Sequence, residues 1–142
     1  MNAKWLIPVD GSQPALHAVE HVIAEAALRK SCPQILLVNV QPSLPSDITR
    51  FIERTAVQDF HREAGDAALA PARKALDAAT LAYSAHILIG DSATCIVEYA
   101  REQACTQIVM GARGLGSVVG LLMGSVMLKV IQQTDFPVVL VK

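Results

Sequence analysis

The sequence predicts an α/β protein built on one doubly wound parallel sheet of five strands, with helices on both faces of the sheet. Short, unbroken apolar runs rich in β-branched residues recur along the chain, and such runs are typical of strands buried on both faces. Segments with a helical apolar stripe separate these runs, and this alternation favours a doubly wound sheet. The 142 residues suit a single domain over 1–142, because two separate cores would each be too small.

Five segments are expected to form the strands. Apolar runs without alternation cover 5–9, 35–40, 108–110 and 138–141. The segment 83–89 instead alternates apolar residues with more polar ones, which indicates a strand with one wetter face near a sheet edge. In sheets of this class ligands bind beyond the carboxyl ends of the strands, so the residues that follow each strand are the candidate functional positions.

The first two helical segments follow the first two strands. Pro14 stands where a first-turn proline belongs, behind Ser12 as a candidate cap, and an apolar stripe follows it. The alanine-rich connection 46–81 is helical in composition, but Gly65 and Pro71 interrupt it. Because an interior proline removes a backbone hydrogen bond, this connection is expected to form two helical pieces or one bent helix.

Two more helices are expected in the second half of the chain. One carries an apolar stripe from Ile96 to Ala104, with Ser92 or Thr94 as its cap. The other spans about 125–133 and precedes the last predicted strand. Strands and helices therefore alternate along the whole chain, as a doubly wound sheet requires.

The composition of the chain argues against a nucleic-acid-binding or membrane protein. Twelve Lys and Arg residues against thirteen Asp and Glu residues give a formal charge of −1, which provides no basic field for nucleic acid or anionic lipid. The uncharged stretch 114–128, which four glycines interrupt, is shorter than the roughly 20 residues that a spanning helix needs. Three cysteines, an odd number, fit reduced thiols in the cytoplasm better than a disulfide framework.

Five of the eight glycines lie between Gly111 and Gly124, after one predicted strand and before the predicted helix that begins at Ser125. Glycines allow positive φ angles and let backbone N–H groups approach an anion closely, and a helix N-terminus favours phosphate. The loop fits neither a P-loop, which needs a lysine before the serine, nor the Rossmann fingerprint, which follows the first strand. The sequence therefore favours a phosphate-binding loop over a loop in which the glycines serve only tight packing.

The spacing of this loop resembles the nucleotide-binding signature of the universal stress protein family. Gly111, two residues, Gly114, nine residues and then Gly124-Ser125 match that signature position for position. Similarity to the first, fourth and last strands of the family, with their adjoining turns, extends over 7–12, 108–114 and 137–141. Two departures, a proline inside the second helix and Ser92 where a proline is common, concern helix geometry rather than the nucleotide loop.

The resemblance implies an adenine-nucleotide alpha-hydrolase-like sheet with the strand order 3-2-1-4-5, and binding of ATP, or of AMP or ADP in its place. Whether Mg²⁺ accompanies the nucleotide is left open. The ribose and phosphates are expected at the backbone of Gly111 and Gly114 and at the amide and hydroxyl of Ser125. Gly124 is expected to leave the backbone accessible to the ligand. Arg113 is expected either to balance phosphate charge or to lie at a solvated loop tip.

The resemblance places the nucleoside at two other strand ends. Asp10 is expected at the adenosine end, where an acidic group suits sugar hydroxyls, and the backbone of Val40 is expected to hydrogen-bond the adenine edge. No catalytic residue and no metal ligand is expected. The complete set of expected ligand-binding residues is Pro8, Val9, Asp10, Val40, Met110, Gly111, Arg113, Gly114, Gly124, Ser125 and Val126.

Two other patterns are typical of different functions. His17-Ala18-Val19-Glu20-His21 matches a zinc-protease pattern, and its two histidines would share one helix face. No further acidic ligand follows downstream, so we interpret these histidines as a solvated helix face. Asp10 could accept a phosphoryl group as in a response-regulator receiver, but the cluster of acidic residues that a receiver needs is missing at the first strand.

Two function classes remain for the expected site. One is a binding module whose choice of protein partner depends on nucleotide occupancy, and the other is a slow ATPase or phosphotransferase. Phosphoryl transfer needs a positioned metal, a group that orients the nucleophile and stabilisation of charge. The loop has no lysine and no carboxylate is placed to activate water, so the sequence favours the binding module.

The last predicted strand, 138–141, favours a homodimer. Its residues are apolar on both faces, and the implied strand order places it at a sheet edge, where bare backbone groups are an aggregation hazard. Antiparallel pairing of two such strands across a two-fold axis would satisfy these groups and close the assembly. The alternative is a monomer whose last strand is shielded by a neighbouring helix.

Overall fold

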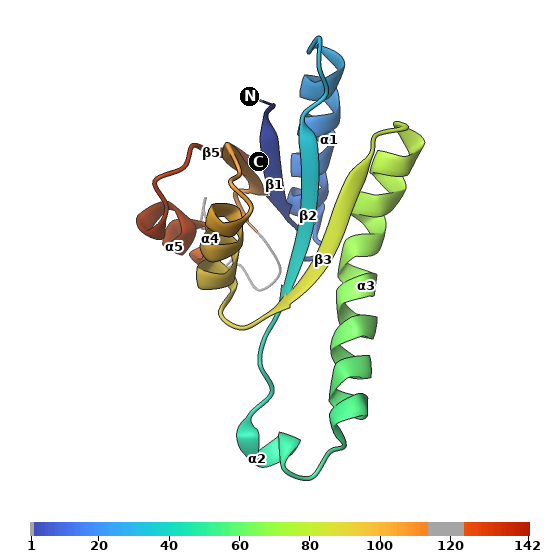
Figure 1. Ribbon diagram of the computed structural model, residues 1–142, viewed down its shortest axis with the longest axis vertical. Coiled ribbons are helices and arrows are strands. Elements are labelled where there is room, and N and C mark those ends of the chain that lie inside the picture. The colour runs from blue at the N-terminus through green and yellow to red at the C-terminus, as the bar shows by residue number, and fades with distance from the viewer. Residues whose placement is uncertain (1, 114–123) are drawn as a thin grey trace.

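The computed structural model describes residues 2–113 and 124–142, and these residues form a sheet with helices on both sides (Figure 1). All five strands run parallel in the order β3-β2-β1-β4-β5, which confirms the predicted fold class. The elements in chain order are β1 (Lys4–Pro8), α1 (Gln13–Ala27), β2 (Gln34–Gln41), α2 (Ser46–Thr49), α3 (Arg54–Ala78), β3 (Tyr83–Ile89), α4 (Ser92–Glu102), β4 (Gln107–Gly111), α5 (Ser125–Gln133) and β5 (Val138–Val141).

The sheet separates two apolar cores, because successive residues of a strand point to opposite faces. On β2, Leu37 belongs to the core that α1 and α3 cover, together with Val19 and Leu69. Its neighbour Leu36 belongs to the core on the other face, which α4 and α5 cover, together with Ile96. Burial on both faces explains why the sequences of the central strands are apolar without alternation.

The edge position of β3 confirms the prediction drawn from its alternating pattern. Tyr83, Ala85 and Ile87 are half-buried against the core that α1 and α3 cover. Ser84 and His86, which point to the opposite face, are exposed. β3 and β5 are the two edge strands of the described sheet.

The long connection after β2 forms the short helix α2 and then one helix of 25 residues, α3. Gly65 and Pro71 both lie inside α3, so the structure excludes the expected alternative of two helical pieces divided at these residues and has one continuous helix. Leu69 and Ala72 are buried beside the proline, and this packing outweighs the lost backbone hydrogen bond. Gly65 lets the helix approach the sheet, since a Cβ atom there would lie 2.4 Å from Cδ1 of Ile87.

The predicted helix cap is confirmed for α1 and wrong for α4. Ser12 Oγ accepts a hydrogen bond from the backbone N–H of Ala15 at 3.3 Å. At α4 the cap is Asp91 rather than Ser92 or Thr94, and its carboxylate accepts from the backbone N–H of Thr94 at 3.1 Å and from its hydroxyl at 2.9 Å. These two bonds, the backbone one foremost, lower the pKa of Asp91. A carboxylate is favoured here because it accepts both bonds and its charge suits the positive helix end.

Candidate functional site

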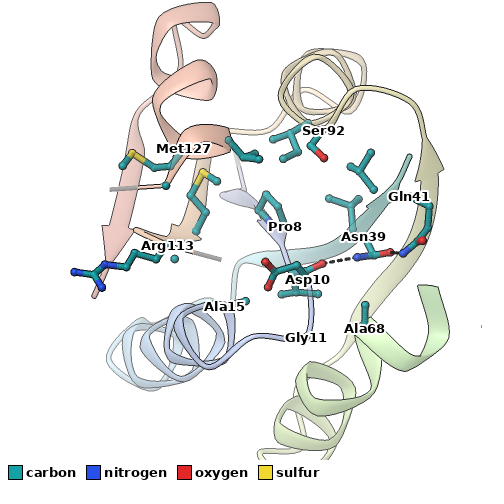
Figure 2. A pocket seen from close by; sticks show the side chains of 18 of the residues that line it. Pro8, Asp10, Gly11, Ala15, Asn39, Gln41, Ala68, Ser92, Arg113 and Met127 are labelled. Carbon is teal, nitrogen blue, oxygen red and sulfur yellow. Dashed lines mark hydrogen bonds between the residues drawn. The ribbon is translucent and has the colours of Figure 1, made fainter. Parts of the chain in front are cut away.

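A cleft opens at the carboxyl ends of β1, β2 and β4. β1 lies at the centre of the sheet, with β2 and β3 on one side of it and β4 and β5 on the other. The loops that leave neighbouring strands therefore diverge at this point, where open α/β sheets bind their ligands. The space between them is a cavity of about 780 Å³, bordered by strand ends, by α3 and by the first turns of α1, α4 and α5 (Figure 2).

The structure brings the expected ligand-binding residues together at this cleft. They come from four separate stretches of the chain, so their meeting depends on the order of the strands rather than on a local motif. Gly114 lies outside the residues that the structure describes. The others all line the cleft, and they are Pro8, Val9, Asp10, Val40, Met110, Gly111, Arg113, Gly124, Ser125 and Val126.

Three helix N-termini border the cleft, and their backbone N–H groups are satisfied in different ways. The side chains of Ser12 and Asp91 cap α1 and α4. The cap residue of α5 is Gly124, which has no side chain to offer. A helix end without a side-chain cap combines N–H donors with the positive end of the helix dipole. Of the three, α5 is the end that an anionic group would satisfy best, and Ser125 is exposed in its first turn.

The two described glycines of the loop, Gly111 and Gly124, do not have positive φ angles, and Gly111 is required by close packing. Gly124 has a φ of −80°, and the described glycines with positive φ are Gly11 and Gly90, which lie in other turns. At Gly111, at the end of β4, an added Cβ atom would lie 2.7 Å from the carbonyl carbon of Pro14. The packing of α1 on β4 therefore requires glycine at position 111, whatever role it has toward a ligand.

Asp10 occupies the turn between β1 and α1, at the edge of the cleft (Figure 2). Its Oδ1 accepts a hydrogen bond from the backbone N–H of Ser12 at 3.0 Å. A short acidic side chain that binds the backbone two residues on is typical of such turns. The half-buried carboxylate thus shapes the entry into α1 as well as lining the cleft.

The expected set of ligand-binding residues does not include two polar residues of the cleft, Asn39 and Gln41, although Gln41 directly follows a predicted strand. Asn39 is only 3% exposed, and its Nδ2 donates to the backbone carbonyl of Val9 at 2.8 Å. Its Oδ1 accepts from Nε2 of Gln41 at 2.6 Å (Figure 2). Asn39 is the single polar residue in the run 35–40, and a buried polar side chain normally has a hydrogen-bond partner that the fold supplies. The wall on the α3 side, which was also missed, consists of small residues: Ala64, Ala67 and Ala68.

The histidines of the zinc-protease pattern lie on α1, away from the lining of the cleft. His17 is exposed, and its Nδ1 lies 3.2 Å from the backbone oxygen of Lys142. Within 2–113 and 124–142, no three His, Cys, Asp or Glu side chains lie close enough together to hold a metal ion. Across the same ranges, no helix combines the length and the apolar character that crossing a bilayer would require.

The strand order, the cleft and the helix ends around it define an open doubly wound α/β protein with a cleft where the strand order reverses, the position at which proteins of this class bind ligands. The model of the Universal stress protein family matches residues 1–142. The chain therefore belongs to the universal stress protein family. A universal stress protein of Methanocaldococcus jannaschii is 31% identical over 142 residues, which cover 98% of this chain and 81% of that protein.

Solved structures share the whole fold. The hypothetical protein MJ0577 has a TM-score of 0.84 and 26% identity, with 100% of this chain and 96% of that chain covered. Two further structures, at 22% and 19% identity, show the same fold with a TM-score of 0.65 each. The first is the Archaeoglobus fulgidus universal stress protein in complex with dAMP, covering 99% of this chain and 98% of that one. The second is a family member from Arabidopsis thaliana with AMP bound, covering 99% and 91%.

Proposed function

We propose that this protein binds an adenine nucleotide in the cleft at the carboxyl ends of β1, β2 and β4, and acts as a nucleotide-dependent binding module in the stress response. The observation that carries the proposal is the N-terminus of α5, which has no side-chain cap and borders a cleft large enough for a nucleotide. The relatives solved with AMP and with dAMP support adenine as the base.

The phosphate end of the proposed site is the first turn of α5. Gly124 allows close approach of the backbone, and the N–H and hydroxyl of Ser125 would donate to phosphate oxygens. Arg113 lines the cleft on the β4 side and would balance phosphate charge. Gly111 and Gly114 complete the backbone that the proposal places against the ribose and phosphates.

The nucleoside end of the proposed site is the gap left where β1 stops and β2 continues. The carbonyl of Val38 accepts from the N–H of Val9 at 2.8 Å, so the backbone groups of Val38 face β1. Backbone groups two residues apart on a strand face the same side, so those of Val40 face the space beyond the end of β1. They would pair with the adenine edge, while Asp10 would accept from ribose hydroxyls.

The proposal is one of binding without rapid turnover. Among the described residues that line the cleft, Asp10 is the only carboxylate, and the proposal places it at the nucleoside end. Phosphoryl transfer needs a group near the γ-phosphate that orients the nucleophile. If ATP is the ligand, Mg²⁺ would arrive with it, held by the phosphates and by water, as is usual for this ion.

We also propose a homodimer formed through β5. β5 is an edge strand, and its four residues, Val138–Val141, are apolar and half-buried. Native proteins normally cover an apolar edge of this kind. Antiparallel pairing of two β5 strands about a two-fold axis would satisfy both edges and close the assembly.

Titration calorimetry with ATP tests the phosphate end. Gly124→Val places a branched side chain at the cap of α5, where the phosphates would lie, so affinity should fall by roughly tenfold or more. Ser125→Ala removes one donor and should cost roughly three- to tenfold. Ala70→Val adds the same side chain at an exposed position of α3 outside the cleft and should bind like the wild type. An affinity of Gly124→Val close to that of Ala70→Val would contradict the assigned site.

A further inference from the structure

We infer that Asn39 is a positioning residue that makes the cleft selective for 6-aminopurines over 6-oxopurines. The inference rests on the proposed function, because it concerns how a base would be recognised in the same cleft. It follows from one side-chain hydrogen bond, from Asn39 to the carbonyl of Val9, that stands in place of a backbone hydrogen bond between β1 and β2 (Figure 2).

The backbone hydrogen bonds between β1 and β2 follow a fixed register. Gln34 N–H donates to the carbonyl of Ala3 at 2.9 Å, and Val9 N–H donates to the carbonyl of Val38 at 2.8 Å at the other end of the pair. In a parallel pair each residue that donates to one partner accepts from the residue two positions further along that partner strand. The next bond in this register would therefore run from Val40 N–H to the carbonyl of Val9.

In the structure the carbonyl of Val9 accepts instead from Nδ2 of Asn39 at 2.8 Å. Among the described residues, no backbone hydrogen bond joins Val40 to Val9. Asn39 is 3% exposed, so water does not compete for this bond. The orientation of its amide is fixed, because a carbonyl can only accept and Nδ2 must face it. Oδ1 then accepts from Nε2 of Gln41 at 2.6 Å.

The N–H of Val40 is consequently left for a ligand. Val40 lines the cleft, and its backbone faces the gap beyond the end of β1. The N–H and C=O of one residue match the N1 acceptor and the 6-amino donor of adenine. Hypoxanthine and guanine carry N1–H and a 6-oxo group at these positions, so they would set donor against donor and acceptor against acceptor. Were the N–H of Val40 bonded to Val9, only its carbonyl would remain to recognise the base.

The test is a calorimetric comparison of AMP, IMP and 1-deaza-AMP, an analogue in which carbon replaces N1 of the base. In the wild type the loss of affinity from AMP to 1-deaza-AMP measures the bond from Val40 N–H, and a ratio of about ten is expected for one such bond. Asn39→Leu keeps the side-chain size but leaves the carbonyl of Val9 to compete for that N–H. For Asn39→Leu the ratio of the affinities for AMP and 1-deaza-AMP should fall to about two, and the preference for AMP over IMP should decrease as well.

A second variant acts on Asn39 without changing the buried residue itself. Gln41→Glu puts a carboxylate, which can only accept, against the amide of Asn39, so Nδ2 would turn away from Val9. The same loss of discrimination is expected. Gln34→Leu replaces an amide by leucine at the exposed far end of β2 and should keep the wild-type ratio. Thermal unfolding of each variant without ligand shows whether the fold is retained.

The outcomes distinguish this inference from the proposed function. A wild-type protein that does not bind AMP would contradict the proposed function itself. If the wild type discriminates against 1-deaza-AMP and both Asn39→Leu and Gln41→Glu keep that discrimination, the role of Asn39 is wrong and the proposed function stands. If the wild type binds AMP and 1-deaza-AMP equally, the role given to Val40 N–H, and with it that of Asn39, is wrong.

Discussion

Asp10 combines two tasks in one carboxylate. Its Oδ1 accepts from Ser12 N–H at 3.0 Å and shapes the entry into α1, and the residue also lines the cleft at the proposed nucleoside end. Loss of a ribose contact should weaken every adenine nucleoside and nucleotide alike, whatever its phosphates. Asp10→Ala should therefore reduce the affinities for adenosine and for ATP by similar factors, each about tenfold, as measured by calorimetry with both ligands.

Asp10→Asn is the matched control for this prediction. Asparagine keeps an oxygen that accepts from Ser12 N–H and from a ribose hydroxyl, while it removes the charge. Its affinity for adenosine should lie between those of the wild type and Asp10→Ala. A collapse of ATP binding with adenosine binding unchanged would contradict the placement at the ribose and would indicate a role through phosphates and metal.

Single residues could be predicted from the sequence where their role is local. Ser12 as a cap and Ser125 as the first residue of α5 follow from their immediate neighbours in the chain. The role of Asn39 could not be predicted from its neighbours in the chain. Its partner Val9 is 30 residues away, and only the pairing of β1 with β2 brings the two together. A polar residue inside an apolar strand signals a buried hydrogen bond, but it does not identify the partner.

At the scale of elements, the packing of α1 on β4 restricts the residue at position 111 to glycine. A Cβ atom at Gly111 would lie 2.7 Å and 2.8 Å from the carbonyl carbon and oxygen of Pro14, and these backbone atoms cannot swing aside. Gly111→Ala should therefore lower the free energy of unfolding by about 1–3 kcal/mol without any ligand, as measured by chemical denaturation. Gly124→Ala should cost about 1 kcal/mol or less, because alanine readily adopts its φ of −80°. Equal losses for the two variants would contradict the packing role of Gly111.

Most elements could be predicted because their patterns depend on the strands and helices themselves. The predicted bounds 83–89, 125–133 and 138–141 are those of β3, α5 and β5. The differences between the predicted and observed elements have physical causes that a local sequence pattern does not show. Burial of α3 against the sheet keeps the helix continuous through Pro71, which excludes only the alternative of two pieces, and the carboxylate of Asp91 caps α4 ahead of the hydroxyl residues that follow it.

At the scale of the whole molecule, strand order decides where the site forms. The alternation of strands and helices predicts a doubly wound sheet, but many strand orders satisfy it. The order 3-2-1-4-5 came from the resemblance to the family, and it is the order that the structure has. With β1 at the centre, residues as far apart in the chain as Asp10, Val40 and Ser125 border one cavity.

The proposed homodimer is tested at the outer edge of β5. The carbonyls of Pro137 and Val141 accept from the N–H groups of Ile108 and Ala112, so odd-numbered residues of β5 face β4 and Leu140 turns its N–H outward. Leu140→Pro should remove one hydrogen bond of the dimer and shift the mass measured by light scattering toward that of one chain. Leu140→Ala, which keeps the N–H, should stay dimeric. A wild-type protein with the mass of a single chain would contradict the dimer.

The central claim is that the cleft holds an adenine nucleotide without rapid turnover. Mass spectrometry of the small molecules released when the purified protein is denatured tests this claim most directly. We expect a stoichiometric adenine nucleotide from the wild type and much less from Gly124→Val, and added ATP should be recovered intact after incubation with the protein and Mg²⁺. Release of no nucleotide together with no binding of added AMP or ATP, or equal release from the wild type and Gly124→Val, would contradict the assigned site.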